Sequence, residues 1–151
     1  MAIKQTTPQN IVNAYLDQEI QRREQALLYN LAYVGEMCIN EARSTTMAAN
    51  NYKDQTGNLR SSVGYVLVHN GRIVQSSSFK SVLNGQQGAT EGNGYAKQLA
   101  KKYRQGIVLI LVAGMNYAVH VQNKGYDVLT SAELMAERLV PRIMKQLGIT
   151  K

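Results

Sequence analysis

Histidine, cysteine and serine are the side chains through which this chain could bind a metal or attack a substrate, and their spacing predicts neither activity. His69 and His120 have no acid or cysteine at a spacing typical of metal ligands. Cys38 falls on the apolar face of a predicted helix, where a free thiol usually packs as a small hydrophobe. The serines at 76–78 lack the strand–turn–helix context of a nucleophile elbow. We therefore expect no catalytic residue and no bound metal.

The glycine-rich segment Gly85–Gly94 and a few carboxylates are the other features with chemical potential. No Gly-Lys-Ser/Thr follows the glycines, so they do not form a phosphate-binding loop, and we expect no cofactor. The acids of the C-terminal half are Glu91, Asp127, Glu133 and Glu137. Their spacing does not indicate a paired-acid site, although a hydrolase of unrecognised type stays open as a third interpretation of the chain.

The chain carries 17 basic and 10 acidic side chains, for a net charge of +7. Such a charge favours anionic partners such as nucleic acid, but it does not indicate a fold. The basic residues are densest at Lys97, Lys101, Lys102 and Arg104. These four side chains either face DNA or form an ordinary solvated helix face.

The length of 151 residues and the hydrophobic fraction of 44% predict a single domain, residues 1–151, with one core. The longest apolar run, Ile107–Ala113, is far shorter than the roughly 18 to 20 residues that cross a bilayer as a helix. The N-terminus lacks the basic and apolar segments of a signal peptide. Because the single cysteine also fits a reducing compartment, we expect a soluble protein made in a cytoplasm.

A long helix is predicted over about residues 8–43, where a Thr-Pro pair forms a typical start and no Gly or Pro interrupts Gln9–Val34. Apolar residues recur on one face, at Val12, Leu16, Ile20, Leu27, Leu31, Val34, Cys38 and Ala42. A polar run at 21–25 narrows this stripe. We therefore expect the first half of the helix to project from the domain toward a partner. A polar connection follows over Ser44–Asp54.

A β-hairpin is predicted over Ser62–Phe79, with Asn70-Gly71 as a type I′ turn between two valine-containing strands. A two-residue turn pairs Leu67 with Val74 and places apolar side chains on both faces near the turn. In a sheet with one face in solvent, apolar and polar side chains would alternate more regularly along each strand. We therefore expect helices on one face of the sheet and another subunit on the other.

Glycine content and apolar runs predict the secondary structure of the middle of the chain. Leu83–Gly94 holds four glycines and is expected to be a mobile loop that binds a neighbour, and Tyr95–Tyr103 a short basic helix. Gly106–Met115 is apolar enough for a central strand, and Tyr117–Val121 is expected to form another strand.

The last segment is predicted to be a helix. A capping box at Thr130–Glu133 opens it, Pro141 should kink or restart it, and Gly148 should end it. Together the elements predict an α+β fold, a small antiparallel sheet of about four strands with a long N-terminal helix, a short middle helix and a C-terminal helix.

Two local motifs stand out, one ahead of the hairpin and one ahead of the last helix. The first is Thr56-Gly57-Asn58-Leu59-Arg60. Its glycine can take a positive φ, its asparagine can cap a short helical turn, its leucine can anchor that turn in the core, and its arginine can reach a carboxylate or a helix end. In the second, Tyr117 and Ala118 start a buried strand and Gly125 turns the chain toward the helix cap. We expect both motifs to build the scaffold.

In these two motifs the sequence resembles the head–tail connector and tail-completion (neck) protein family of long-tailed bacteriophages. That family typically shows a Thr-Gly-x-Leu-Arg-x-Ser segment after an N-terminal helix, then a β-hairpin. A Tyr-Ala-x-x-Val/His-x-x-Gly segment and a C-terminal helix come later. The same order covers about residues 24–148 of this chain.

The resemblance implies a structural virion protein of the phage neck or tail. Such a protein forms a hexameric or dodecameric ring that joins the tail to the capsid, with DNA passing non-specifically through the lumen. The implied partners are further copies of the chain and neighbouring neck, tail-tube or tail-terminator proteins, with no membrane. The alternative is a basic, non-specific nucleic-acid-binding or DNA-packaging accessory module that acts through the residues from Lys97 to Arg104.

Overall fold

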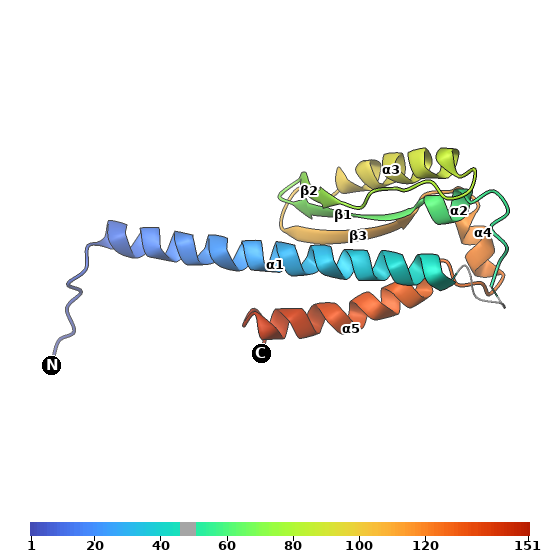
Figure 1. Ribbon diagram of the computed structural model, residues 1–151. Helices are drawn as coiled ribbons and strands as arrows, with labels where there is room; N and C mark the ends of the chain where they lie inside the picture. Colours follow the sequence, from blue (N-terminus) through green and yellow to red (C-terminus); the bar gives the residue numbers. More distant parts are fainter. Residues whose placement is uncertain (46–50) are drawn as a thin grey trace.

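The computed structural model of the protein describes residues 1–45 and 51–151 and has a three-stranded antiparallel sheet with helices on both faces (Figure 1). In chain order the elements are α1 (Gln9–Thr45), α2 (Asn58–Ser61), β1 (Val63–His69), β2 (Arg72–Ser76), α3 (Gln86–Ala100), β3 (Ile107–Ala113), α4 (Ala118–Asn123) and α5 (Thr130–Gln146). The predicted α+β class is confirmed. Residues 46–50 of the polar connection expected over Ser44–Asp54 lie outside the described residues.

The predicted hairpin forms, and β1 is the central strand in the order β2-β1-β3. Asn70 and Gly71 have φ angles of 50° and 81°, as a type I′ turn requires. The expected pairing of Leu67 with Val74 is wrong, because Leu67 pairs with Gln75. A β-bulge adds one residue to β2 at this point and shifts the register.

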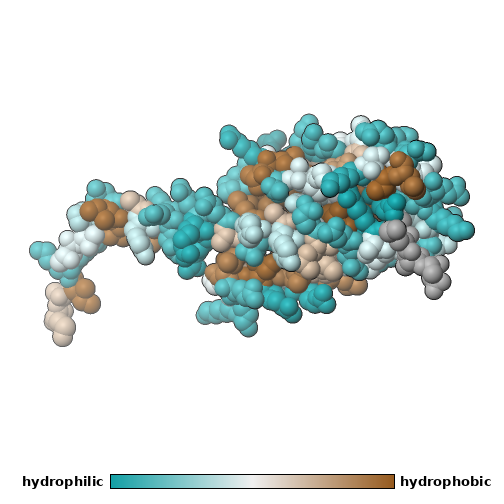
Figure 2. Space-filling view, viewed as in Figure 1, coloured by the Kyte–Doolittle hydropathy of each residue, from teal (hydrophilic) through white to brown (hydrophobic). Residues whose placement is uncertain are grey.

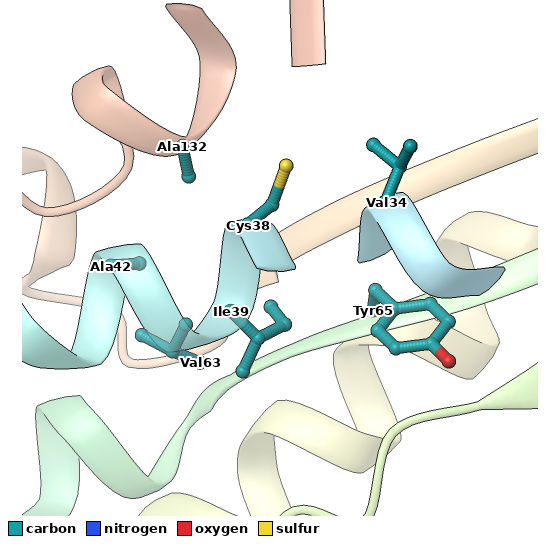
Figure 3. Close-up of a cluster of buried hydrophobic side chains, with 7 residues drawn as sticks. All are labelled: Val34, Cys38, Ile39, Ala42, Val63, Tyr65 and Ala132. Carbon is teal, nitrogen blue, oxygen red and sulfur yellow. The ribbon is translucent and has the colours of Figure 1, made fainter. Parts of the chain in front are cut away.

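Both faces of β1 are covered by helices of the same chain. Alternate β1 side chains enter two clusters of buried residues, one with α1 and α5 (Figure 3) and one with α3. The first consists of Val34, Cys38, Ile39, Ala42, Val63, Tyr65 and Ala132, and the second of Val66, Val68, Ala96, Ala100, Ile110 and Val112. The expectation that another subunit covers one face is therefore wrong for the central strand, because α3 already lies there.

The sheet has three strands rather than about four, because the predicted strand Tyr117–Val121 lies mostly in α4. Its valines favour a strand, but its side chains that contact the core are Tyr117, Ala118 and Val121. Val121 lies four and three residues after the other two, a spacing that places these side chains on one face of a helix.

Most of the predicted mobile loop, Leu83–Gly94, is wrong as a loop because it forms the first half of α3. A Cβ on Gly88 would lie 1.9 Å from the backbone oxygen of Asn58, and one on Gly92 would lie 2.4 Å from that of Ser62. The glycines therefore allow α3 to pack directly on the backbone of α2 and the start of β1. The expected short basic helix is the second half of this same helix.

The predicted N-terminal helix, residues 8–43, is α1, and its first half extends beyond the body of the protein as expected (Figure 1). Its buried residues, from Leu31 to Ala42, all lie in the second half. No helix in the described ranges combines the length and the apolar character needed to cross a bilayer.

The C-terminal helix α5 runs through Pro141 without the restart that was one of the two expected outcomes. Gly148, with a φ of 70°, follows its end as predicted. The predicted capping box is wrong. Asp127 supplies the cap instead, because its carboxylate accepts hydrogen bonds from the Ser131 backbone N–H, at 3.1 Å, and from the Ser131 hydroxyl.

Candidate functional site

The side chains with catalytic potential lie apart from one another. Among the described residues, no three His, Cys, Asp or Glu side chains gather as a metal site. Cys38 is buried in the cluster of α1, α5 and β1 side chains, and burial raises the pKa of its thiol. Ser77 is also buried, and its Oγ accepts a hydrogen bond from the Tyr65 backbone N–H at 2.9 Å. Both residues thus belong to the scaffold.

The two sequence motifs meet in one corner of the fold. Leu59 from the first motif and Ala118 from the second share a buried cluster with Tyr52, Met115 and Val128. Leu59 is 1% exposed, which agrees with its predicted role as a core anchor. Each motif thus supplies part of the same hydrophobic cluster.

Gly57 and Asn58 position the corner against α3. Gly57 has a φ of 78°, and a Cβ there would lie 2.0 Å from the Val82 backbone oxygen, so only glycine fits. Asn58 does not cap its own helical turn as expected, because its Oδ1 accepts a hydrogen bond from the Gly88 backbone N–H at 3.0 Å. The asparagine thus ties the start of α3 to α2. Thr56 Oγ1 accepts a hydrogen bond from the Asn58 N–H at 3.3 Å.

The remaining motif residues also have structural surroundings. The Arg60 backbone N–H donates to Asp54 Oδ2 at 3.1 Å, whereas its half-buried side chain has an Nε without a hydrogen-bond partner among the described residues. Tyr117 precedes α4, and burial raises the pKa of its phenol, with Asp54 and Glu91 adding to the rise. Gly125 follows α4 with a φ of 86°.

The projecting half of α1 carries an apolar surface in contact with solvent, which we call the α1 ridge. It consists of Ile11, Val12, Tyr15, Leu16 and Ile20. Four of these side chains are more than half exposed, from 51% for Leu16 to 68% for Tyr15. Figure 2 shows a hydrophobic patch toward the outer end of this arm, with mostly hydrophilic surface between it and the body. Large exposed apolar patches are commonly sites of binding to other molecules.

Beside the second half of α1 runs an apolar groove of about 530 Å³, which we call the α1/β2 groove. Its lining comes from α1, β1 and β2 and consists of Leu28, Tyr29, Ala32, Tyr33, Glu36, Tyr65, Leu67, Val74 and Gln75. Three side chains at its rim are largely in solvent: Tyr29 is 79% exposed, Tyr33 62% and Val74 47%. The β-bulge in β2 contributes to this shape, because Val74 and Gln75, although adjacent in a strand, both line the groove.

Tyr65 forms part of the groove lining and is itself fully buried. Its ring packs on Gly35, where a Cβ would lie 2.8 Å from the ring carbons. Its hydroxyl points away from the other labelled side chains of the cluster (Figure 3). Burial raises the pKa of Tyr65, the Glu36 side chain raises it further, and a hydrogen bond with the Gln75 side chain lowers it. The hydroxyl therefore has polar neighbours within its own chain.

The four predicted DNA-facing side chains, Lys97, Lys101, Lys102 and Arg104, are all exposed. Arg104 lies beside the hairpin turn, close to Gly71. Next to it, the Asn70 N–H donates to the Gly106 carbonyl, and the Gly106 N–H donates to Asn70 Oδ1. The turn brings in a further exposed base, Arg72, which the sequence did not single out. The structure thus places a basic surface at the end of α3 and the tip of the hairpin.

The sequence interpretation also missed the α1/β2 groove, although a signal was present. Tyr29 and Tyr33 are four residues apart, hence on one face of the helix, and that face differs from the apolar stripe that packs on the sheet. No protein-family model, no curated protein and no solved structure matches the chain. Function must therefore be inferred from the side chains and surfaces described above.

Proposed function

We propose that this chain is a structural virion protein of the phage neck or tail, a head–tail connector or tail-completion protein that forms a ring and joins the tail to the capsid. The observation that carries the proposal is the α1 ridge, whose large apolar side chains stay in solvent on a projecting helix. Exposed apolar surfaces of this kind serve binding to other chains. The two motifs that resemble the phage family support the specific class, because both lie in one corner that organises the scaffold.

In this proposal the chain is made in the host cytoplasm and becomes part of the virion. Its partners are further copies in a hexameric or dodecameric ring and the neighbouring neck, tail-tube or tail-terminator proteins. DNA passes non-specifically through the lumen. The chain needs no catalytic residue, cofactor or metal for this role.

Removal of the gene from its phage tests the proposal. We expect complete heads and complete tails that fail to join, which negative-stain electron microscopy of the lysate would show. Normal virions from the deletion phage would contradict the proposal. A cheaper observation comes first: portal, major capsid and tail-tube genes should lie beside this gene, whereas a regulatory or toxin operon would count against a virion role.

The alternative function is a basic, non-specific nucleic-acid-binding or DNA-packaging accessory module. The observation that favours it is the exposed basic surface of Lys97, Lys101, Lys102 and Arg104, together with Arg72 at the hairpin tip. Gel shifts over a salt series separate the two functions. A channel lining predicts weak binding that is indifferent to sequence and falls steeply with salt, whereas tight binding selective for one sequence would favour the alternative.

A further inference from the structure

The α1 ridge and the α1/β2 groove are two separate apolar surfaces of one chain, and the chain cannot bring them together. The ridge lies on the first half of α1, and one wall of the groove is the second half of the same helix. Figure 1 shows that this helix is continuous and straight, so its first half points away from the groove beside its second half. The ridge of one chain therefore cannot fill the groove of that same chain.

From the ridge and the groove we infer that the projecting half of α1 of one copy docks in the α1/β2 groove of the next copy. The inference deepens the proposed ring, because it names the surfaces through which copies bind. The two surfaces differ and lie at different places on the chain, so each contact is heterologous and leaves one free ridge and one free groove. Contacts of this kind continue from copy to copy until a ring closes.

The size of the two surfaces matches a specific interface. The projecting segment 9–23 is about 22 Å long as a helix, at about 1.5 Å per residue, enough to lie along the groove. Four ridge side chains are 51% to 68% exposed, and the three at the groove rim are 47% to 79% exposed. Covering these seven side chains removes on the order of 1,000 Å² from water, the lower bound for a specific interface.

The composition of the groove also suits this occupant. Tyrosines are enriched in the buried centres of interfaces, and the groove presents three of them, Tyr29, Tyr33 and Tyr65. Tyr29 and Tyr33 are exposed and can be covered by a docked helix, whereas Tyr65 is already buried within its own chain.

A second apolar crevice lies between α1, β3 and α5 and is the competing site. Its lining includes Leu31, Leu109, Val140 and Met144. None of the lining side chains is among the large hydrophobic residues that protrude into solvent. Tyr29, Tyr33 and Val74 of the α1/β2 groove do protrude, so this groove is the site we assign.

Two variants used singly and together test the inference. Leu16→Asp removes the ridge and keeps the groove, whereas Tyr33→Asp removes the groove and keeps the ridge. Both positions are exposed, at 51% and 62%, so both variants should melt at the wild-type temperature. Each variant alone should associate at least about 30-fold more weakly than wild type, as expected for a hot-spot residue. Sedimentation over a concentration series measures this affinity. Leu134→Asp and Val119→Asp, at positions 61% and 66% exposed elsewhere, are the matched controls and should associate like wild type.

The mixture of the two variants gives the decisive result. A heterologous contact predicts a complex with one copy of each that grows no further, because only one intact ridge and one intact groove remain. A ridge that packs on another ridge predicts that Tyr33→Asp associates normally and that the mixture gives no such complex, which would overturn the inference. Loss of association in Val140→Asp with no loss in Tyr33→Asp would overturn it in favour of the crevice.

The outcome is separable from the proposed function. A wild-type chain that stays monomeric at every concentration and yet is required to join heads to tails would refute the docking contact and leave the proposed function standing. A one-to-one mixed complex from a chain whose gene deletion leaves virions normal would refute the phage role and leave the docking contact standing.

Discussion

Helices α1 and α3 lie on opposite faces of the same sheet but contact it in different ways. α3 presents small residues to its neighbours, so that its backbone touches those of α2 and β1, and it closes its face of the sheet. α1 presents larger side chains, leaves a groove toward β2, and continues into solvent for its first half. The difference is that α3 packs on the fold along its length, whereas α1 does so only with its second half. In the docking that we propose, the first half of α1 serves assembly.

The largest expected effect is the difference in stability lost when a charge is introduced in each half of α1. Val34 is fully buried, so Val34→Asp places an unpaired charge in the core and should cost several kcal/mol, a large part of the stability of a domain this size. Leu16→Asp makes the same kind of change on the projecting half and should leave the melting temperature unchanged. Thermal melting of both variants checks this. Equal destabilisation would show that the first half of α1 belongs to the cooperative fold.

The next effect concerns α3 and its close contacts. A Cβ at Gly88 would lie 1.9 Å from the Asn58 backbone oxygen, so Gly88→Ala should destabilise the protein by about 1–3 kcal/mol. Gly94 on the same helix has no neighbouring atom within 4 Å. Gly94→Ala should therefore stabilise it by about 0.5–1 kcal/mol through helix propensity. Chemical denaturation measures both, and the same sign for both changes would contradict the packing role of the α3 glycines.

A smaller effect is expected at the groove. The Tyr65 hydroxyl is buried and interacts with the Glu36 and Gln75 side chains of its own chain, so Tyr65→Phe should destabilise the monomer by about 0.5–1.5 kcal/mol. The same change should leave association unaltered, because a docked helix does not reach a hydroxyl without exposed surface. Melting of dilute protein and sedimentation of concentrated protein give the two values. A loss of association without a loss of monomer stability would contradict this role of the hydroxyl.

The smallest effect is a pH dependence of the projecting helix. Arg22 and Arg23 bind the Glu19 carboxylate, at 2.8 Å and 3.2 Å, and these hydrogen bonds lower its pKa from 4.5 to about 2. A lowered folded-state pKa means that the stabilisation is complete above pH 4.5 and is lost as the pH falls toward about 2. Circular dichroism should show a small loss of helix over that window. Glu19→Gln should remove this part of the pH dependence, and an unchanged profile would contradict the ion pairs.

The sequence predicted α1, the hairpin and the end of α5 because each depends on local rules. Apolar periodicity, an Asn-Gly turn and a terminal glycine need no distant partner. The glycines of α3 misled the prediction because their role depends on a distant backbone. Gly88 and Gly92 resemble a flexible loop until α2 and Ser62 lie against them.

In the candidate site, too, features set by local sequence could be predicted and features set by distant contacts could not. The role of Leu59 as a core anchor followed from its own motif, and the projecting half of α1 followed from the polar run that interrupts its stripe. Only the α1 wall of the α1/β2 groove could be predicted, from the spacing of Tyr29 and Tyr33. The rest of the groove depends on the bulge that lets both Val74 and Gln75 line it and on the packing of Tyr65 against Gly35. Neither feature is evident from the local sequence.

Cross-linking between copies tests most directly the claim that the first half of α1 serves assembly. Cys38 is buried and burial raises its pKa, so a cysteine introduced at the surface would be the reactive one. Chains with Leu16→Cys, mixed with chains with Tyr33→Cys and a short bismaleimide linker, should give a mixed dimer in high yield. Chains with Val119→Cys in place of Tyr33→Cys should give little. Equal yields from the two mixtures would contradict the account.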